Sequence, residues 1–388
     1  MTQDFAMPLP QTPTTTSGLS ARLRDRTQAR HQANALQVRT PQGTLTTLIG
    51  ASEQRGATQL AARLGGIHAW LEDDLIGVEH TLRVLAGRGA DLADRAASHL
   101  LARPGKRVRP MCVLLASRLG EHQTEQEVVL GLAVAAELTH AATLLHDDVL
   151  DNADERRGAP SARAMFGNAV SVLGGDHLLI EALRRVSLSG EQGLLLGLFD
   201  AVGEMIAAEA LQLAIAGKFE PCADNYHAII GGKTAALFRW ALRAGGTVAG
   251  LAEEHLEALE RAGTAFGFAF QLIDDALDLD QAPEVMGKDA CQDLREGKLT
   301  WPLICAAERD PAVADILAVG FADATVREDD AWIASTRARL IATGCTAATR
   351  ERARAFVRTA QLELARLPRT EAREALQVLT ASAVARTK

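Results

Sequence analysis

Apolar residues recur with a period of 3.6 from about residue 60 almost to the end of this 388-residue chain. That period is typical of amphipathic helices. Before residue 60 the pattern is absent, and a proline- and threonine-rich stretch covers residues 8–16. We therefore expect a poorly ordered N-terminal tail over residues 1–60. No domain boundary is evident after it, so residues 61–388 are predicted to form a single all-helical domain.

The helix predicted over residues 127–151 is apolar nearly all round, which is typical of a central helix rather than a peripheral one. A second long helix is predicted over residues 253–279. The same pattern predicts further helices over 67–85, 90–101, 167–188 and 194–216, one that starts near Pro110, and several after residue 301. An all-α fold follows from this reading.

Each of the two long helices ends in an acidic D-D-x-x-D cluster. The first contains Asp147, Asp148 and Asp151, and the second contains Asp274, Asp275 and Asp278. On a helix, the first and last aspartates of each cluster share one face. Carboxylates crowded in apolar surroundings repel one another and lose solvation, so such a site favours bound cations. Two clusters facing each other would suit Mg²⁺ and a polyphosphate.

Basic residues stand in several of the predicted loops and helix breaks. They are Lys106, Arg109, Arg156, Arg157, Lys233 and Lys298. Lysine binds phosphate as a point charge and arginine as a fork. A solvated basic turn is the alternative reading of the stretch around Lys106. The sequence thus predicts that more than one diphosphate binds near the acidic clusters.

Three other polar features of the predicted helices bear on the site, and two of them leave alternatives open. Lys233 follows two glycines, but this is not a P-loop, because no strand precedes it and His227 occupies the first glycine position of that motif. We expect Lys233 to project from a helix kinked or thinned by those glycines. His140 is either an ordinary core histidine or part of the site. Glu209 and Gln212 either face the site or belong to a surface stripe.

Composition excludes several classes of protein. The formal charge of −8 argues against a nucleic-acid binder. The five cysteines are scattered and lack C-x-x-C spacing, which favours reduced thiols in a cytoplasmic protein. No apolar run reaches the length of a membrane span, and the polar N-terminus is not a signal peptide.

In combination, the motifs resemble those of the trans-isoprenyl diphosphate synthase (polyprenyl synthetase) family. They are the stretches 105–110, 140–151 and 270–275, with Arg156-Arg157-Gly158, Lys233-Thr234-Ala235 and Gly287-Lys288-Asp289. They follow the family's order and spacing over roughly residues 65 to 386. The resemblance implies an isoprenoid synthase fold, in which helices surround a central cavity, and a homodimer.

The resemblance also implies roles for individual residues. The six aspartates of the two clusters would bind Mg²⁺ ions that hold an allylic diphosphate. Further contacts on the allylic side would come from Arg156, Lys233, Thr234, Gln271, Lys288 and Lys298. Isopentenyl diphosphate would be held by Lys106, Arg109, His140 and Arg157. The implied reaction ionises the allylic diphosphate and adds isopentenyl diphosphate to the cation, inside an apolar cavity that excludes water.

Product length is implied by the two residues four and five positions before the first aspartate. In the family, bulky residues there stop growth early, whereas this chain has the small residues Thr143 and Ala142. We therefore expect a geranylgeranyl or longer product. The alternatives are a shorter-chain farnesyl diphosphate synthase and a class I terpene cyclase. A non-catalytic partner subunit and a Mg²⁺-dependent phosphohydrolase are less favoured, because the aspartates are retained and no positioned base is evident.

Overall fold

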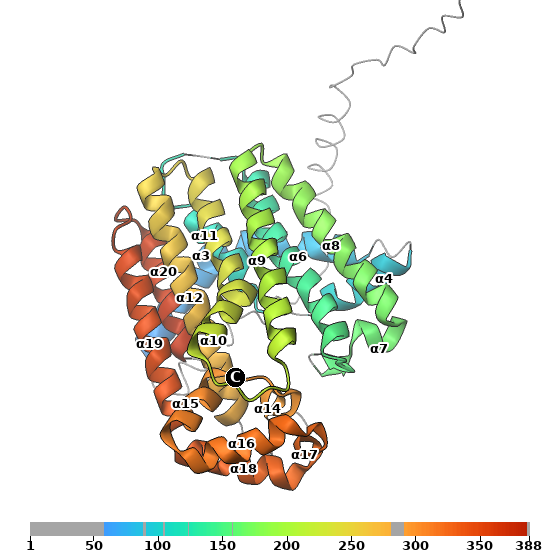
Figure 1. Ribbon diagram of the computed structural model, residues 1–388. Helices are drawn as coiled ribbons and strands as arrows, with labels where there is room; N and C mark the ends of the chain where they lie inside the picture. The colour runs from blue at the N-terminus through green and yellow to red at the C-terminus, as the bar shows by residue number, and fades with distance from the viewer. Residues whose placement is uncertain are drawn as a thin grey trace, which may run out of the picture. The chain divides into compact units, whose positions relative to one another are not determined.

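Two helices, α6 (Gln126–Leu150) and α12 (Glu253–Asp280), carry the acidic clusters and lie at the centre of the fold (Figure 1). The structure is a computed structural model that describes residues 58–87, 91–103, 105–122, 124–156, 158–280 and 291–385. In these residues, secondary structure is helical except for one short hairpin. The predicted all-α class is therefore confirmed.

The first half of the described chain packs around α6. Its other helices are α3 (Thr58–Ala86), α4 (Leu92–Leu101), α5 (Val108–Ala116), α7 (Ala162–Phe166), α8 (Asn168–Leu188) and α9 (Gln192–Ile215). Helix α6 packs most extensively against α8 and α5, and its middle is buried all round, from Leu132 to Thr139. Helix α3 begins at Thr58, within the predicted tail; residues 1–57 lie outside the described part, where the tail stays a prediction.

The second half packs around α12. It contains α10 (Ala223–Ile230), the π-helical segment η1 (Gly231–Ala235), α11 (Ala236–Val248), α14 (Gln292–Glu296), α15 (Trp301–Arg309), α16 (Pro311–Ala322), α17 (Ala324–Glu328), α18 (Asp330–Ala342), α19 (Cys345–Leu364), α20 (Glu371–Ser382) and η3 (Ala383–Ala385). Helices α19 and α11 cover α12 most extensively. The short helices α14 to α18 gather at one end of α12, over a separate small apolar core (Figure 1).

Two local predictions need correction. Helix α5 begins at Val108, so Pro110 is its third residue rather than its first. The stretch after Asp151 is not only a polar loop, because Glu155–Arg156 (β1) pairs antiparallel with Ala159–Pro160 (β2). Gly158 makes the turn between the strands with a φ of 71°, a conformation in which glycine has no steric cost.

The statement that no apolar run reaches the length of a membrane span also needs correction. Helix α6 is long and apolar enough to cross a membrane by length and composition, although 61% of its most apolar window is buried inside the protein. Burial of an apolar helix by α5 and α8 is the ordinary state of a core helix. The apolar character of α6 is therefore explained by its central place in the fold.

The segment η1 interrupts the helix before α11, as the two glycines predicted. π-helical turns are rare in proteins, but those that occur are often found at functional sites. Gly232 lies so close to α9 that an added Cβ would stand 2.4 Å from the carbonyl oxygen of Glu204. Glycine at this position therefore lets α9 approach the backbone of the segment that carries Lys233.

We expect Gly232→Ala to lower the free energy of unfolding by about 1–3 kcal/mol, because the new methyl group would push against the backbone of α9. The measurement is urea denaturation followed by circular dichroism. The control is Gly131→Ala in α6, where an added Cβ meets nothing within 4 Å. That change should raise stability by up to about 1 kcal/mol through helix propensity. Equal effects of the two changes would contradict the close-packing argument.

Candidate active site

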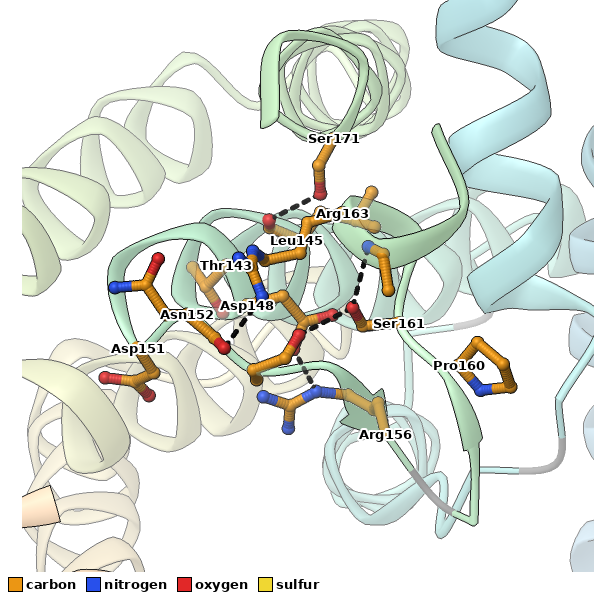
Figure 2. A network of polar contacts seen from close by, with 12 residues as sticks. Thr143, Leu145, Asp148, Asp151, Asn152, Arg156, Pro160, Ser161, Arg163 and Ser171 are labelled. Carbon is orange, nitrogen blue, oxygen red and sulfur yellow. Dashed lines mark hydrogen bonds and ion pairs between the residues drawn. The ribbon is translucent and has the colours of Figure 1, made fainter. Parts of the chain in front are cut away.

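The first acidic cluster lies at the C-terminal end of α6. Asp148 is buried, and its Oδ1 accepts a hydrogen bond of 2.5 Å from Nε of Arg156 in β1 (Figure 2). Asp151 follows the helix, and its Oδ2 lies 3.0 Å from Nζ of Lys298. Burial raises the pKa of Asp147 to about 6, although Lys233 acts to lower it. Burial also raises the pKa of Asp148, against the opposing effect of Arg156.

The loop after this cluster is held by hydrogen bonds to its backbone. Ser161 donates to the carbonyl oxygen of Ala153 at 2.6 Å, and Arg163 donates to that of Asn152 at 2.7 Å (Figure 2). These contacts fix the hairpin that carries Arg156 beside Asp148. A single arginine placed in this way partly offsets the cost of burying the carboxylate.

The second acidic cluster lies in the last two turns of α12. The buried carboxylate of Asp275 accepts hydrogen bonds from the hydroxyl of Tyr226, at 2.6 Å, and from Nε2 of Gln271, at 2.9 Å. Asp278 accepts hydrogen bonds from the backbone amides of Gln292, at 2.9 Å, and Asp293, at 3.3 Å. Burial raises the pKa of Asp275 to about 7 and that of Asp278 to about 6.

Two lysines connect the clusters. Lys298, which pairs with Asp151 of the first cluster, follows α14, the helix whose first amides bind Asp278 of the second. Lys233 acts on Asp147, and its neighbour Thr234 donates a 2.8 Å hydrogen bond to Gln271, which in turn binds Asp275. Asp147 and Asp275 are thus linked through Lys233, Thr234 and Gln271, while the facing of the two clusters across one site stays a prediction.

The open question about Glu209 and Gln212 is resolved by Lys233. Its Nζ forms an ion pair with Glu209 and lies 3.4 Å from Oε1 of Gln212. Both residues of α9 therefore face the site rather than a surface stripe. Arg157 and Lys288 lie outside the described residues, so their predicted roles stay predictions.

The residues predicted to hold isopentenyl diphosphate lie around the start of α5 and on α6. The guanidinium of Arg109 lies 4.7 Å from the centre of the Phe238 ring, and its Nε is buried without a hydrogen-bond partner. Burial lowers the pKa of Arg109, whereas Glu137 and Asp274 act to raise it. Lys106 is exposed, and His140 is half-buried one turn after Glu137. Arg109 thus lies within electrostatic reach of the second cluster.

The residues predicted to set product length lie just before the first cluster on α6. Ala142 is buried, and Thr143 is half-buried, with its hydroxyl donating to the carbonyl oxygen of His140 at 2.8 Å. Neither side chain is bulky, so neither adds an aromatic wall at this turn.

The donor set suits a hard divalent cation such as Mg²⁺, because every candidate ligand is a carboxylate oxygen. Oδ2 of Asp148 is buried without a hydrogen-bond partner, so it has a free position for a cation. In the described part of the chain, no three His, Cys, Asp or Glu side chains are gathered tightly enough to hold a metal ion. The carboxylates instead contact Arg156, Lys298 and the start of α14.

Sequence reasoning missed two groups of the site. Tyr226 is the only tyrosine of the chain, yet its role as a donor to Asp275 could not be recognised from spacing. Asp293 is a further, half-buried carboxyl group, and its pKa is raised to about 8 by loss of solvation and then by Asp278. It lies 15 residues beyond Asp278, so helical spacing gives no signal for their proximity.

A family model described as polyprenyl synthetase matches residues 90–331. The chain belongs to the polyprenyl synthetase family. It is 35% identical to octaprenyl diphosphate synthase of Escherichia coli (strain K12) over 314 residues, which are 81% of this chain and 96% of that protein. It is 34% identical to nonaprenyl diphosphate synthase of Mycobacterium tuberculosis over 291 residues, which are 74% of this chain and 85% of that protein.

Solved structures of polyprenyl synthetases have the same fold. The polyprenyl synthase of Caulobacter crescentus CB15, crystallised with calcium and isoprenyl diphosphate, matches with a TM-score of 0.77 at 35% identity, over 83% of this chain and 97% of that one. The decaprenyl diphosphate synthase of Rhodobacter capsulatus matches with a TM-score of 0.76 at 33% identity, over 84% and 99%. The predicted family, isoprenoid synthase fold and trans-prenyltransferase function are confirmed.

Proposed function

We propose that this polyprenyl synthetase condenses an allylic diphosphate with isopentenyl diphosphate, head to tail, to give a geranylgeranyl or longer polyprenyl diphosphate. The observation that supports the proposal is that Lys298 and Lys233, beside the first acidic cluster, are connected to the second through α14 and through Thr234 and Gln271. Paired carboxylate clusters with cations between them suit a metal-bridged diphosphate. The octaprenyl and nonaprenyl relatives favour the longer part of the product range.

Each part of the site has a task in this reaction. The aspartates Asp147, Asp148, Asp151, Asp274, Asp275 and Asp278 hold Mg²⁺ in the proposal, and the bound ion supplies positive charge to the leaving diphosphate. Arg156, Lys233 and Lys298 stand beside these carboxylates, where they stabilise the negative charge that develops as the C–O bond breaks. On the opposite side, Lys106, Arg109 and His140 hold the diphosphate of the second substrate.

We expect the purified protein with Mg²⁺ to incorporate labelled isopentenyl diphosphate only when an allylic diphosphate is also present. Asp147→Asn and Asp274→Asn should each lower turnover by about 10²-fold or more, because each removes charge from the proposed metal site. Removal of Mg²⁺ by a chelator should abolish turnover reversibly. Product is measured by radiochromatography.

The control for this assay is Asp315→Asn, which changes an exposed carboxylate of α16 and should leave turnover unchanged. Turnover of the allylic diphosphate alone would instead indicate a terpene cyclase. Absence of incorporation with every allylic primer would refute the proposed condensation.

Ala142 and Thr143 should determine part of the product length, because they lie one turn before the proposed metal site on α6. We expect Ala142→Phe combined with Thr143→Phe to shorten the product, since two phenyl groups would close the path of the growing chain. Reversed-phase chromatography of the dephosphorylated product measures the chain length. Thr143→Val is the matched control, because it removes the hydrogen bond to His140 without adding bulk. Unchanged length in the double variant would place the stop elsewhere.

We further propose that the protein is a homodimer formed through α8 and α9. Apolar side chains of α9 are exposed at spacings of three and seven residues, which is the pattern of a helix that packs against a partner. They are Leu196, Phe199, Ile206 and Leu213, and α8, which packs beside α9, adds Leu173, Ile180 and Leu188. A second copy of the chain would cover both stripes.

Ile206→Asp should convert the dimer to a monomer, because a carboxylate would be buried in the apolar centre of the interface. Static light scattering measures the mass. Ile206 is 65% exposed in the single chain, and Leu362 on α19 is 71% exposed, so Leu362→Asp is a matched control that should leave the mass unchanged. A monomeric native protein would contradict this proposal.

All five cysteines are free thiols, and four of them are buried. Reduced cysteines are typical of proteins of the cytoplasm, which supports the proposed cytoplasmic location.

A further inference from the structure

In the sequence, Arg107 lies between Lys106 and Arg109, the two cations of the proposed isopentenyl diphosphate site. Its own side chain makes other contacts. Its side chain is buried, 8% exposed, and its Nε lies 2.5 Å from Oε1 of Glu79 on α3. Its Nη1 forms a second ion pair, with Oε1 of Glu137 on α6. One guanidinium thus joins the start of α5 to α3 and to the helix that carries the first acidic cluster.

The backbone around Arg107 has little freedom to take another path. Arg107 has a φ of 52°, a left-handed conformation that is uncommon for a residue with a side chain. A Cβ added at Gly105 would stand 2.5 Å from Nη1 of Arg107 and 3.0 Å from Oε1 of Glu137. The loop therefore passes directly over the ion pairs, and only glycine fits there without displacing them.

The charges of this network extend to the substrate side. Glu137 acts electrostatically on Arg109 as well as pairing with Arg107. His140, another residue proposed to bind isopentenyl diphosphate, follows Glu137 by three residues on α6. Stability alone explains such a network poorly, because buried ion pairs can often be replaced by apolar residues of similar volume without loss of stability. The geometry of the loop gives the better explanation.

We propose that Arg107, held by Glu79 and Glu137, is a positioning residue that sets Lys106 and Arg109 for the diphosphate of isopentenyl diphosphate. This inference rests on the proposed function, because it concerns the second substrate of that reaction. Arg107 itself touches neither substrate. Its two ion pairs hold the loop and the start of α5 against α6, so that the cations on both sides of Arg107 point toward one anion.

The test is Arg107→Lys, which keeps the charge but cannot fork between two carboxylates. We expect the KM for isopentenyl diphosphate to rise about tenfold, because a small displacement of the binding cations weakens their contacts with the anion. The KM for the allylic diphosphate should change less than about twofold, since Arg156, Lys233 and Lys298 are untouched. Steady-state kinetics with each substrate varied in turn measures both constants.

Arg118→Lys is the matched control. Arg118 lies just after α5 and forms an ion pair with Asp74, so it also joins this part of the chain to α3. It lies at the other end of α5 from Arg109 and is not one of the predicted site residues, so we expect both KM values to stay within about twofold of those of the native protein. A rise in the KM for isopentenyl diphosphate in this control would show that any loosening of α5 has the same effect, and would overturn the specific role of Arg107.

Two further variants test the same role if Arg107→Lys does not fold. They are Glu79→Gln and Gly105→Ala. Glu79→Gln leaves the pair with Glu137 in place, and Gly105→Ala changes the loop without removing a charge. Both should raise the KM for isopentenyl diphosphate selectively. Unchanged or equally raised KM values in these variants, with an active native protein, would overturn the inference. A native protein that never incorporates isopentenyl diphosphate would instead refute the proposed function.

Discussion

Burial of carboxylates at the ends of two apolar helices is the constraint on which this structure depends. Water is largely excluded from these positions, so the ionised form of each aspartate is disfavoured unless positive charge or donors replace the lost solvation. Burial accordingly raises the pKa of Asp147, Asp275 and Asp278. Arg156, Lys298 and Tyr226 supply part of the compensation. Carboxylates that are only partly compensated suit a site that receives divalent cations.

Several irregular elements of the fold place the positive charges and hydrogen-bond donors that compensate the buried aspartates. The hairpin of β1 and β2 places Arg156 beside Asp148, and the short helix α14 presents its first amides to Asp278. The π-helical segment η1 places Lys233 and Thr234 between α9 and α12. Regular helices build the walls and supply Tyr226 and Gln271, whereas the breaks between them supply the other donors, because a break frees backbone amides and directs side chains out of the helical repeat.

Helix α6 connects the two halves of the proposed reaction. Its last turn carries the first acidic cluster, which is proposed to face the allylic substrate. Glu137, which pairs with Arg107 of the basic loop, and His140 lie earlier on the same helix. Because one helix carries both sets, the proposed reaction would have the distance between its two substrates set by the helical rise rather than by a flexible connection. The ion pairs of Arg107 then relate the basic loop to that same helix.

The sequence by itself determined the helical class, the two D-D-x-x-D clusters and the resemblance to the family. These features are local, since a spacing of three or four residues on a helix decides which side chains share a face. Boundaries were less predictable, as the start of α5 shows, because helix ends depend on contacts outside the helix.

Only the tertiary structure decided which local surfaces meet. Lys298 and Asp151 are 147 residues apart, and Tyr226 and Asp275 are 49 apart, so no periodicity relates them. The same holds for Arg107 and Glu79, whose pairing depends on how α3 packs beside the start of α5. Packing of whole helices brings such groups together, and their electrostatic consequences arise only when burial has removed the water between them.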